Sequence, residues 1–242
     1  MEKRLGGRAV LAGVDLEVRR GETVVVIGRS GGGKSVLLKH IVGLMHPDRG
    51  SIVVLGRDVT RMAGAEWAEL RGRLGMVFQG AALFDSLTVG ENVALGVRVR
   101  RRLAEPEEQA LVKEKLAQVG LHDVEHLKPA SLSGGMKKRV ALARAIAPDP
   151  EVLLYDEPTT GLDPVMADVI NRLIRDQQRR LGLSAVVVTH DMASAYFVGD
   201  RIAYLHQGRI HQVGTPEEIR SSRDPLVRGF VEGRSQGLTV AG

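Results

Sequence analysis

Apolar residues fall along this chain in short blocks whose spacing predicts alternating strands and helices. The block 23–27 is apolar after its first threonine and mostly β-branched, which is typical of a buried strand. Apolar residues then recur at helical spacing over 36–45, until Pro47-Asp-Arg-Gly50 interrupts the pattern. Alternation of apolar and polar residues over 14–18 predicts a half-exposed strand. Further strands are expected at 51–55, 76–78, 152–155, 185–189 and 201–205.

Between residues 80 and 147 the pattern becomes that of helices. Thr88-Val-Gly-Glu91 matches a capping box, Pro106 opens a run that extends to Val119, and 135–147 is amphipathic. Asp163-Pro164 then predicts the start of a helix that reaches about Leu181. Strands that alternate with helices indicate an α/β fold, with a parallel sheet covered on both faces and a helical lobe inserted into it.

A glycine-rich segment joins the strand 23–27 to the helix that follows. Its residues are Gly28, Arg29, Ser30, Gly31, Gly32, Gly33, Lys34, Ser35 and Val36. Glycines let consecutive backbone N–H groups point inward around an anion, and the start of the helix adds positive potential. Lys34 supplies a cation and the Ser35 hydroxyl suits Mg²⁺. The segment therefore predicts a loop that binds the phosphates of a nucleotide.

The composition restricts the kinds of site that the chain can build. Its 242 residues suffice for one large domain, or for a core with a smaller lobe. The absence of cysteine excludes disulfides, zinc–cysteine sites, iron–sulfur clusters and a cysteine nucleophile. No apolar run approaches the roughly 20 residues of a membrane span, and the first residues lack an apolar signal core, so we expect residence in the cytoplasm. The residues after Gly233 are expected to be loosely ordered.

The formal net charge is +5, and the most basic run is Arg98 to Arg102. Such a run is either a solvated helix end or a contact for an anionic membrane surface or an acidic partner. Aromatic residues make up only 3% of the chain, which leaves no stacking platform for bases. We therefore expect no nucleic-acid partner.

Further polar side chains follow three of the predicted strands. Asp156 and Glu157 come after 152–155, His190 follows 185–189, and Gln79 follows 76–78. The carboxyl ends of parallel strands meet at one edge of the sheet, where functional groups of α/β proteins collect. There Asp156 can hold Mg²⁺ and Glu157 can orient or deprotonate an attacking water.

Ser133, Gly134 and Gly135 precede Met136 at the start of the helix 135–147. Small residues before a helix leave free N–H groups that can bind an anion. The alternative is a plain glycine-rich helix start.

Taken in order, these motifs resemble the ATP-binding cassette (ABC) family over nearly the whole chain. They are the segment 28–35, Gln79, Leu-Ser-Gly-Gly-Met at 132–136, Asp156-Glu157, Thr160-Gly-Leu-Asp163 and His190. The resemblance implies a P-loop NTPase fold in one domain, 1–242. Its α/β core would comprise 1–79 and 148–220 with an antiparallel edge, its helical lobe 80–147, and its C-terminal helix and tail 221–242.

The resemblance also implies a site that two copies share. Paired head to tail, Ser133 and Gly135 of one copy would close over an ATP held by Lys34 and Ser35 of the other. Asp163 would lie at the junction between the copies. Gln79 would link Mg²⁺ to the helical lobe and take part in catalysis with Glu157 and His190. ATP and Mg²⁺ are the expected cofactors.

A narrower resemblance is to the ATPases of Mce/Mla-type lipid transporters. It rests on the segments 33–44, 78–84 with 87–92, 133–139 and 224–230, and on methionine at Met136 where most ABC proteins have glutamine. It implies ATP-driven movement of phospholipid or another hydrophobic molecule through an integral membrane permease. A periplasmic Mce-type lipid-binding protein and a small regulatory subunit are the further partners expected at the cytoplasmic face of the bacterial inner membrane.

Leu5 lies near the place where ABC proteins have an aromatic residue that stacks on adenine. Either apolar contacts and the partner copy hold the base, or residues upstream of Met1 are missing. Two other functions are weighed against transport. A soluble ABC ATPase acting on DNA or ribosomes would usually add coiled coils, zinc sites or tandem cassettes, and a P-loop kinase or GTPase would lack the segment 133–136.

Overall fold

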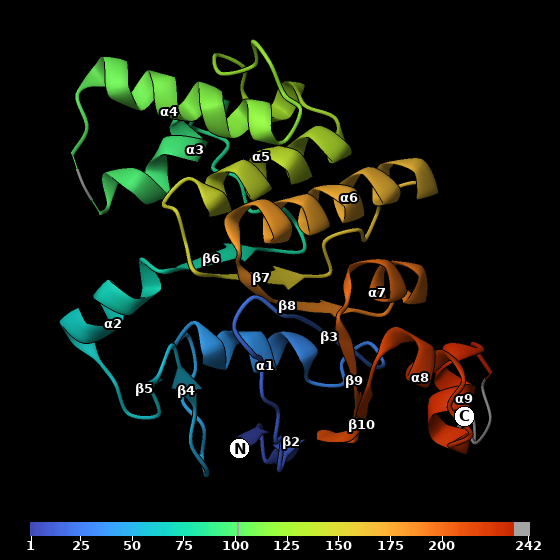
Figure 1. The fold of residues 1–242 in the computed structure, drawn as a ribbon. Helices are drawn as coiled ribbons and strands as arrows, with labels where there is room; N and C mark the ends of the chain where they lie inside the picture. Colours follow the sequence, from blue (N-terminus) through green and yellow to red (C-terminus); the bar gives the residue numbers. More distant parts are fainter. Residues whose placement is uncertain (101, 235–242) are drawn as a thin grey trace.

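The computed structural model describes residues 1–100 and 102–234 and places a six-stranded sheet between layers of helices (Figure 1). The strand order is β10-β9-β3-β8-β7-β6. All neighbouring strands are parallel except β10, which pairs antiparallel with β9 at one edge. The strands are β3 (Thr23–Ile27), β6 (Leu74–Val77), β7 (Val152–Asp156), β8 (Ser184–Thr189), β9 (Arg201–His206) and β10 (Arg209–Gly214). The expected α/β fold, with a parallel core and an antiparallel edge, is confirmed.

The two faces of the sheet belong to two separate hydrophobic clusters. Val24 and Val26 of β3 pack on the face that also carries the helix α1 (Lys34–Ile41). Val25 and Ile27 pack on the other face. Because both faces are covered, every residue of β3 is buried, which explains its continuous apolar sequence.

Helices cover the second face more extensively than the first. Figure 1 shows α3, α4, α5 and α6 on the side of the sheet opposite α1. They are α3 (Val89–Arg98), α4 (Glu105–Gln118), α5 (Gly134–Ile146) and α6 (Pro164–Leu181), with a 3₁₀ turn at Pro129–Ser131. The remaining helices are α2 (Gly64–Arg71), α7 (Met192–Val198), α8 (Pro216–Arg220) and α9 (Pro225–Val231). No described helix combines the length and apolar character that a membrane crossing requires.

The predicted starts of α3 and α6 are confirmed in their hydrogen bonds. The Thr88 hydroxyl accepts from the Glu91 N–H at 3.1 Å, and the Glu91 carboxylate accepts from the Thr88 N–H at 2.7 Å. Asp163 accepts from the first backbone N–H groups of α6 at 3.0 Å, and Pro164 occupies the first helical position. Local sequence therefore sets where these two helices begin.

Two strand predictions were wrong. Residues 14–18 form no strand; Val14 is buried, and Leu16 and Val18 pack against the cluster around α1. Their alternation reflects burial on one side of an extended segment rather than pairing in a sheet. The strand expected at 51–55 shortens to β4 (Val53–Val54), which pairs with β5 (Arg57–Asp58).

Several elements gave too weak a signal to be predicted. A hairpin of β1 (Glu2–Leu5) and β2 (Arg8–Ala12) precedes the sheet. The helices α2, α7 and α8 are eight residues long or shorter, and each buries only a few side chains. The expectation for the end of the chain falls mainly on residues 235–242, outside the described residues.

Replacing Thr88 by alanine removes the side-chain acceptor of this capping box. We expect the free energy of unfolding to fall by about 1 kcal/mol, the usual effect of losing an N-cap, when urea denaturation is followed by circular dichroism. Thr88→Ser keeps the hydroxyl and should retain most of the stability. Equal urea midpoints for Thr88→Ala and the unchanged chain would contradict a stabilising role for the cap.

Candidate functional site

The phosphate loop leaves the carboxyl end of β3 and turns back into α1. A Cβ on Gly28 would lie 2.5 Å from the Leu205 carbonyl oxygen, so only glycine fits at the start of the loop. Gly33 has a φ of 99°, a backbone conformation that other residues rarely adopt. As the N-cap of α1 it offers no side chain, which leaves the first N–H groups of the helix free to bind an anion.

Lys34, the first residue of α1, is buried where the loop joins the helix. Its ammonium donates to the carbonyl oxygens of Gly28 at 2.8 Å and Arg29 at 3.2 Å. Its Nζ also lies 3.4 Å from Oε1 of Glu157, which follows β7, the second strand from β3 in the sheet. The cation is therefore fixed over the loop and paired with a carboxylate.

Ser35 and Asp156 meet at the same edge of the sheet. The Ser35 hydroxyl donates to Oδ1 of Asp156 at 2.8 Å. A hydroxyl and a carboxylate oxygen this close match the oxygen ligands that Mg²⁺ prefers, with phosphate and water supplying the others. The two residues therefore fit the expected magnesium site.

The remaining predicted loop residues surround Lys34 and Ser35. Arg29, Ser30 and Gly31 are exposed, and the Gly32 N–H donates to the Arg29 carbonyl oxygen at 3.0 Å, which closes the turn. Val36 is partly buried and packs against the cluster around α1. The loop thus exposes residues 29–31 to solvent, while packing of Val36 holds its end in place.

Glu157 follows β7 in a left-handed conformation, with a φ of 48°. For a residue other than glycine this costs on the order of 1–3 kcal/mol. Its own N–H donates to the Val188 carbonyl oxygen at 2.9 Å, which holds the turn in place. In this conformation the carboxylate lies beside the phosphate loop and contacts Lys34.

Hydrogen bonds fix the same carboxylate from two segments, the end of β8 and the turn that follows β7. Nδ1 of His190 lies 2.8 Å from Oε2 of Glu157, and the Thr160 hydroxyl donates to that oxygen at 3.3 Å. An ionised carboxylate only accepts, so Nδ1 carries the proton in this contact. Nε2 of the half-exposed His190 ring then remains available to another group.

Lys138, which was not predicted to be a site residue, connects Gln79 to Glu157. Gln79 is exposed and follows β6, and its backbone carbonyl oxygen accepts a hydrogen bond from the ammonium of Lys138 on α5. The same ammonium donates to the Glu157 carbonyl oxygen at 3.4 Å. The sequence signal was a lysine on a predicted helix face that is otherwise apolar.

Ser133, Gly134 and Gly135 begin α5, on the face of the sheet opposite α1. Ser133 caps the helix by accepting from the Met136 N–H at 3.2 Å. Among the described residues, no hydrogen bond or ion pair joins these three residues or Asp163 to the phosphate loop. Ser133, Gly134 and Asp163 are exposed, so another molecule can reach them.

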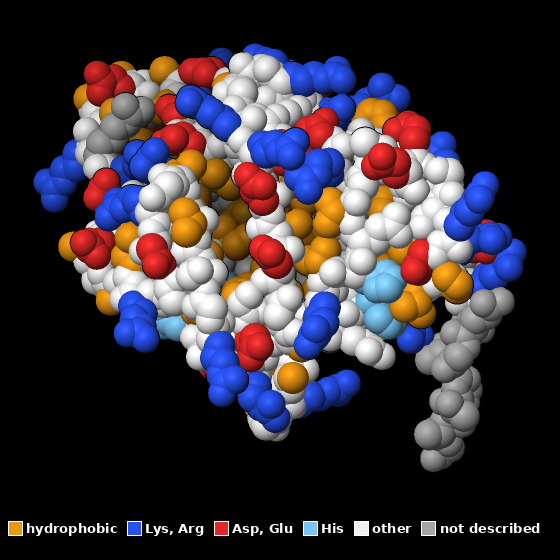
Figure 2. Space-filling model, turned by 60° about the horizontal axis from the view of Figure 1, so that its bottom comes forward, with side chains coloured by type: hydrophobic (Ala, Val, Ile, Leu, Met, Phe, Trp, Pro, Cys, Tyr) orange, Lys and Arg blue, Asp and Glu red, His pale blue; other side chains and the backbone are white. Residues whose placement is uncertain are grey.

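An aromatic cluster that was not predicted lies beside the phosphate loop. Leu5 ends β1 and is 37% exposed, whereas Tyr204 packs on Phe230 with ring centroids 5.1 Å apart. These rings, His206 and Arg29 line a cavity of about 180 Å³. On the right of Figure 2, histidine side chains lie beside exposed apolar side chains. Tyr204 on the predicted strand 201–205, with His206 directly after that strand, was the available signal.

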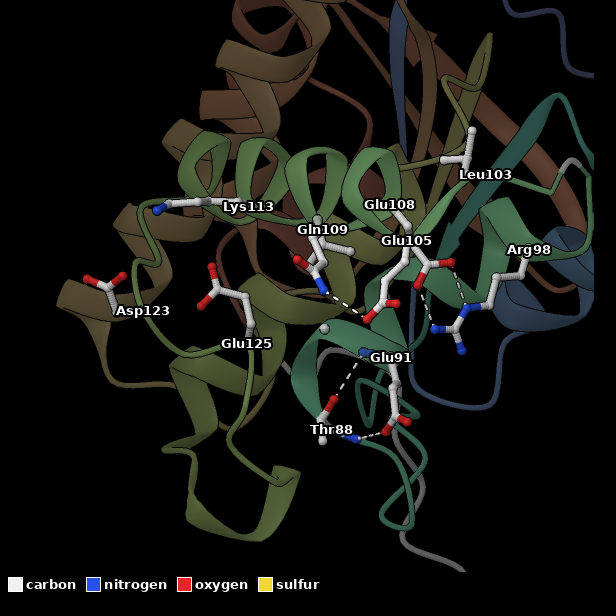
Figure 3. Close-up of a pocket in the computed structure, with 12 residues that line it drawn as sticks. Thr88, Glu91, Arg98, Leu103, Glu105, Glu108, Gln109, Lys113, Asp123 and Glu125 are labelled. Atoms are coloured by element: carbon white, nitrogen blue, oxygen red, sulfur yellow. Dashed lines mark hydrogen bonds and ion pairs between the residues drawn. The ribbon is translucent and has the colours of Figure 1, made fainter.

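A larger hollow of about 670 Å³ lies between α3, α4 and the segment that follows α4 (Figure 3). Five of its lining residues are acidic, Glu91, Glu105, Glu108, Asp123 and Glu125. We call this hollow the acidic groove.

The basic run 98–102 begins at the rim of the acidic groove. Arg98 pairs with Glu108 at 2.6 Å, and Arg100 donates to the Pro148 carbonyl oxygen. These two arginines are therefore engaged by their own chain, and residue 101 is outside the described residues. On the face drawn in Figure 2, basic and acidic side chains are interspersed.

Comparisons with known proteins agree with this geometry. The family profile described as "ABC transporter" matches residues 11–160. Protein TRIGALACTOSYLDIACYLGLYCEROL 3, chloroplastic, of Arabidopsis thaliana is 43% identical over 97% of this chain and 72% of its own length. The intermembrane phospholipid transport system ATP-binding protein MlaF of Haemophilus influenzae is 38% identical over 96% and 88%. This relative supports the resemblance to Mla-type ATPases.

A relative with a different cargo is equally similar. The sulfate/thiosulfate import ATP-binding protein CysA of Xylella fastidiosa is 44% identical over 96% of this chain and 69% of its own.

A solved structure matches the fold. It is the dimeric ATP-binding cassette MJ0796 bound to ADP and Pi, with a TM-score of 0.82 and 33% identity over 89% of this chain and 95% of that one. Family profile, relatives and fold agree with the phosphate loop described above. The chain belongs to the ABC transporter family, as an ATP-binding subunit that hydrolyses ATP.

Proposed function

We propose that this chain is the motor of a membrane lipid transporter, in which ATP closes a head-to-tail pair of chains and hydrolysis reopens it. The observation that carries the proposal is the meeting of Lys34, Ser35, Asp156, Glu157 and His190 at one edge of the sheet. A cation for the phosphates, two oxygen ligands for Mg²⁺, and a carboxylate and a histidine placed to act on water are together able to support hydrolysis of a nucleotide.

Each group has a separate task in the proposed chemistry. Lys34 and the free N–H groups of α1 bind the phosphates, for which Lys34 leaves its contact with Glu157. Ser35 and Asp156 hold Mg²⁺, with Gln79 joining them; the bound ion would offset phosphate charge. Glu157 orients or deprotonates the attacking water.

His190 completes the proposed site from β8. Its Nδ1 is engaged by Glu157, so the Nε2 side of the ring faces the γ-phosphate. The hydrogen bond fixes the ring without using the nitrogen that meets the phosphate.

We infer that Ser133, Gly134, Gly135 and Asp163 act on the nucleotide of a second copy. These residues begin α5 and α6, across the sheet from α1. Ser133, Gly134 and Asp163 are exposed. The likeness to a dimeric cassette supports the pairing.

Phospholipid, or another hydrophobic molecule, is the proposed cargo. The similarity to MlaF and the methionine at Met136 support it, while the similarity to CysA makes a small anion the second candidate. The complex would contain an integral membrane permease, a periplasmic Mce-type lipid-binding protein and a small regulatory subunit. It would work at the cytoplasmic face of the bacterial inner membrane.

We further propose that the acidic groove receives a basic cytoplasmic segment of the permease. Glu105 and Glu125 lie on opposite walls, one at the start of α4 and the other in the segment after it (Figure 3). A cationic segment between them would gain electrostatic complementarity and a fixed orientation. The groove borders α3, whose start follows the segment after Gln79. Movement of the groove would thus accompany movement near the nucleotide.

Lys34→Ala should weaken binding of Mg-ATP about 10- to 100-fold, because it removes a charge-assisted contact worth ~1.5–3 kcal/mol. Calorimetric titration measures the dissociation constant directly. Lys39→Ala removes an exposed lysine from the same helix and is the matched control. Equal affinity in Lys34→Ala and Lys39→Ala would remove Lys34 from the site.

Glu157→Gln should bind Mg-ATP normally but stop turnover, since an amide cannot take a proton from water. The ATP-bound dimer should then accumulate and be detectable by size-exclusion chromatography with light scattering. Adding Ser133→Arg to this variant should abolish the dimer, because the large side chain blocks the proposed shared surface. Rapid hydrolysis by Glu157→Gln, or a dimer that persists with Ser133→Arg, would contradict the proposal.

Purification from detergent extracts should yield the chain bound to a polytopic membrane protein together with phospholipid, identified by mass spectrometry. Glu105→Lys with Glu125→Lys should reduce recovery of that protein at least tenfold and leave ATPase activity of the isolated chain intact. Glu66→Lys, an exposed acid on α2, is the control. Recovery with nucleic acid or ribosomes alone would overturn the transport proposal, and bound sulfate without lipid would overturn the cargo.

A further inference from the structure

Lys138 is a buried cation whose ammonium joins two parts of the nucleotide site. It lies on α5 and is only 7% exposed. Its ammonium donates to the carbonyl oxygens of Gln79 and Glu157, which follow the neighbouring strands β6 and β7. No other described side chain donates hydrogen bonds to both segments.

A charged group in this position is costly. Moving an ammonium from water into a protein interior is strongly unfavourable unless nearby groups compensate its charge. Burial lowers the pKa of Lys138, and the carboxylates of Asp156 and Glu157 oppose that change. A methionine would fill similar space without the penalty, so packing alone does not account for a lysine here.

A bound nucleotide would affect the contacts of Lys34 and Lys138, the two lysines beside Glu157, in different ways. Lys34 contacts the carboxylate itself and is the group that phosphate would attract. Lys138 binds backbone oxygens, for which an incoming phosphate does not compete. Its contacts can therefore persist while Lys34 changes partner.

Lys138 also lies close along its helix to the residues proposed to meet the second copy. Ser133 caps the start of α5, and the five residue steps from Ser133 to Lys138 correspond to ~7.5 Å along the axis. A helix is stiff over this length, so movement of its start moves Lys138 as well.

We propose that Lys138 is a positioning residue that ties the catalytic carboxylate and Gln79 to α5. Through it, the contact of Ser133 and Gly135 with one nucleotide sets the position of Glu157 at the other. This inference rests on the proposed shared site. The rate should consequently depend on ATP with a Hill coefficient above 1, because each site works well only when the other is filled.

The test compares K138M, K138R and K137M in the full chain, with Mg-ATP as ligand. In K138M we expect kcat to fall about 10- to 100-fold, the usual effect of a displaced catalytic group. Its dissociation constant should stay within about threefold, and its Hill coefficient should fall to 1. K138R keeps a donating cation and should recover most of kcat. K137M, at the neighbouring half-buried lysine, should behave as the unchanged chain.

Three results would overturn the positioning role. One is an unchanged kcat and Hill coefficient in K138M. The second is parallel loss of ATP binding and melting temperature in both K138M and K138R, which indicates support of the fold alone. The third applies if K138M does not fold: it is a loss of kcat in K138R that has folded normally. Hyperbolic turnover by an unchanged chain that stays monomeric in ATP would instead contradict the shared site itself, a separate failure of the proposed function.

Discussion

The site depends on how charge is balanced around the Glu157 carboxylate. Lys34 approaches one of its oxygens, His190 and Thr160 hold the other, and Lys138 binds its backbone carbonyl. Without such partners a buried carboxylate would strongly destabilise the fold. In the proposed function Lys34 is also the cation that binds phosphate, so nucleotide binding would redistribute this balance. That redistribution gives the proposed motor a physical connection between binding and catalysis.

Sheet topology brings these groups together. The parallel strands β3, β7 and β8 end at the same edge, so the phosphate loop, Asp156-Glu157 and His190 become neighbours although they are far apart in sequence. Parallel backbone pairing of β3 with β8 and of β8 with β7 keeps the strand ends in register. On the second face, α5 carries Lys138 towards the site, while Ser133 and Gly134 at its start are exposed to solvent and Gly135 is buried. The helix α5 thus contacts the nucleotide site through Lys138 and exposes Ser133 and Gly134 to solvent.

The sequence was informative where local rules decide. Continuous β-branched runs identified β3 and β8, capping residues identified the starts of α3 and α6, and glycines identified the phosphate loop. It misled at 14–18, because alternation records burial and not strand pairing. Lys138 was missed because its partners are backbone oxygens of two distant segments, a relation that only packing of α5 on β6 and β7 creates. The cluster of Tyr204 and Phe230 likewise joins β9 to a helix far along the chain.

Calorimetric titration of the unchanged, folded chain with ATP, in the presence and absence of Mg²⁺, tests the central claim most directly. The account predicts saturable binding of one nucleotide per chain, tighter with Mg²⁺ because Ser35 and Asp156 then share an ion with the phosphates. Absence of binding heat from Mg-ATP at several temperatures, with material whose fold is verified by circular dichroism, would contradict it.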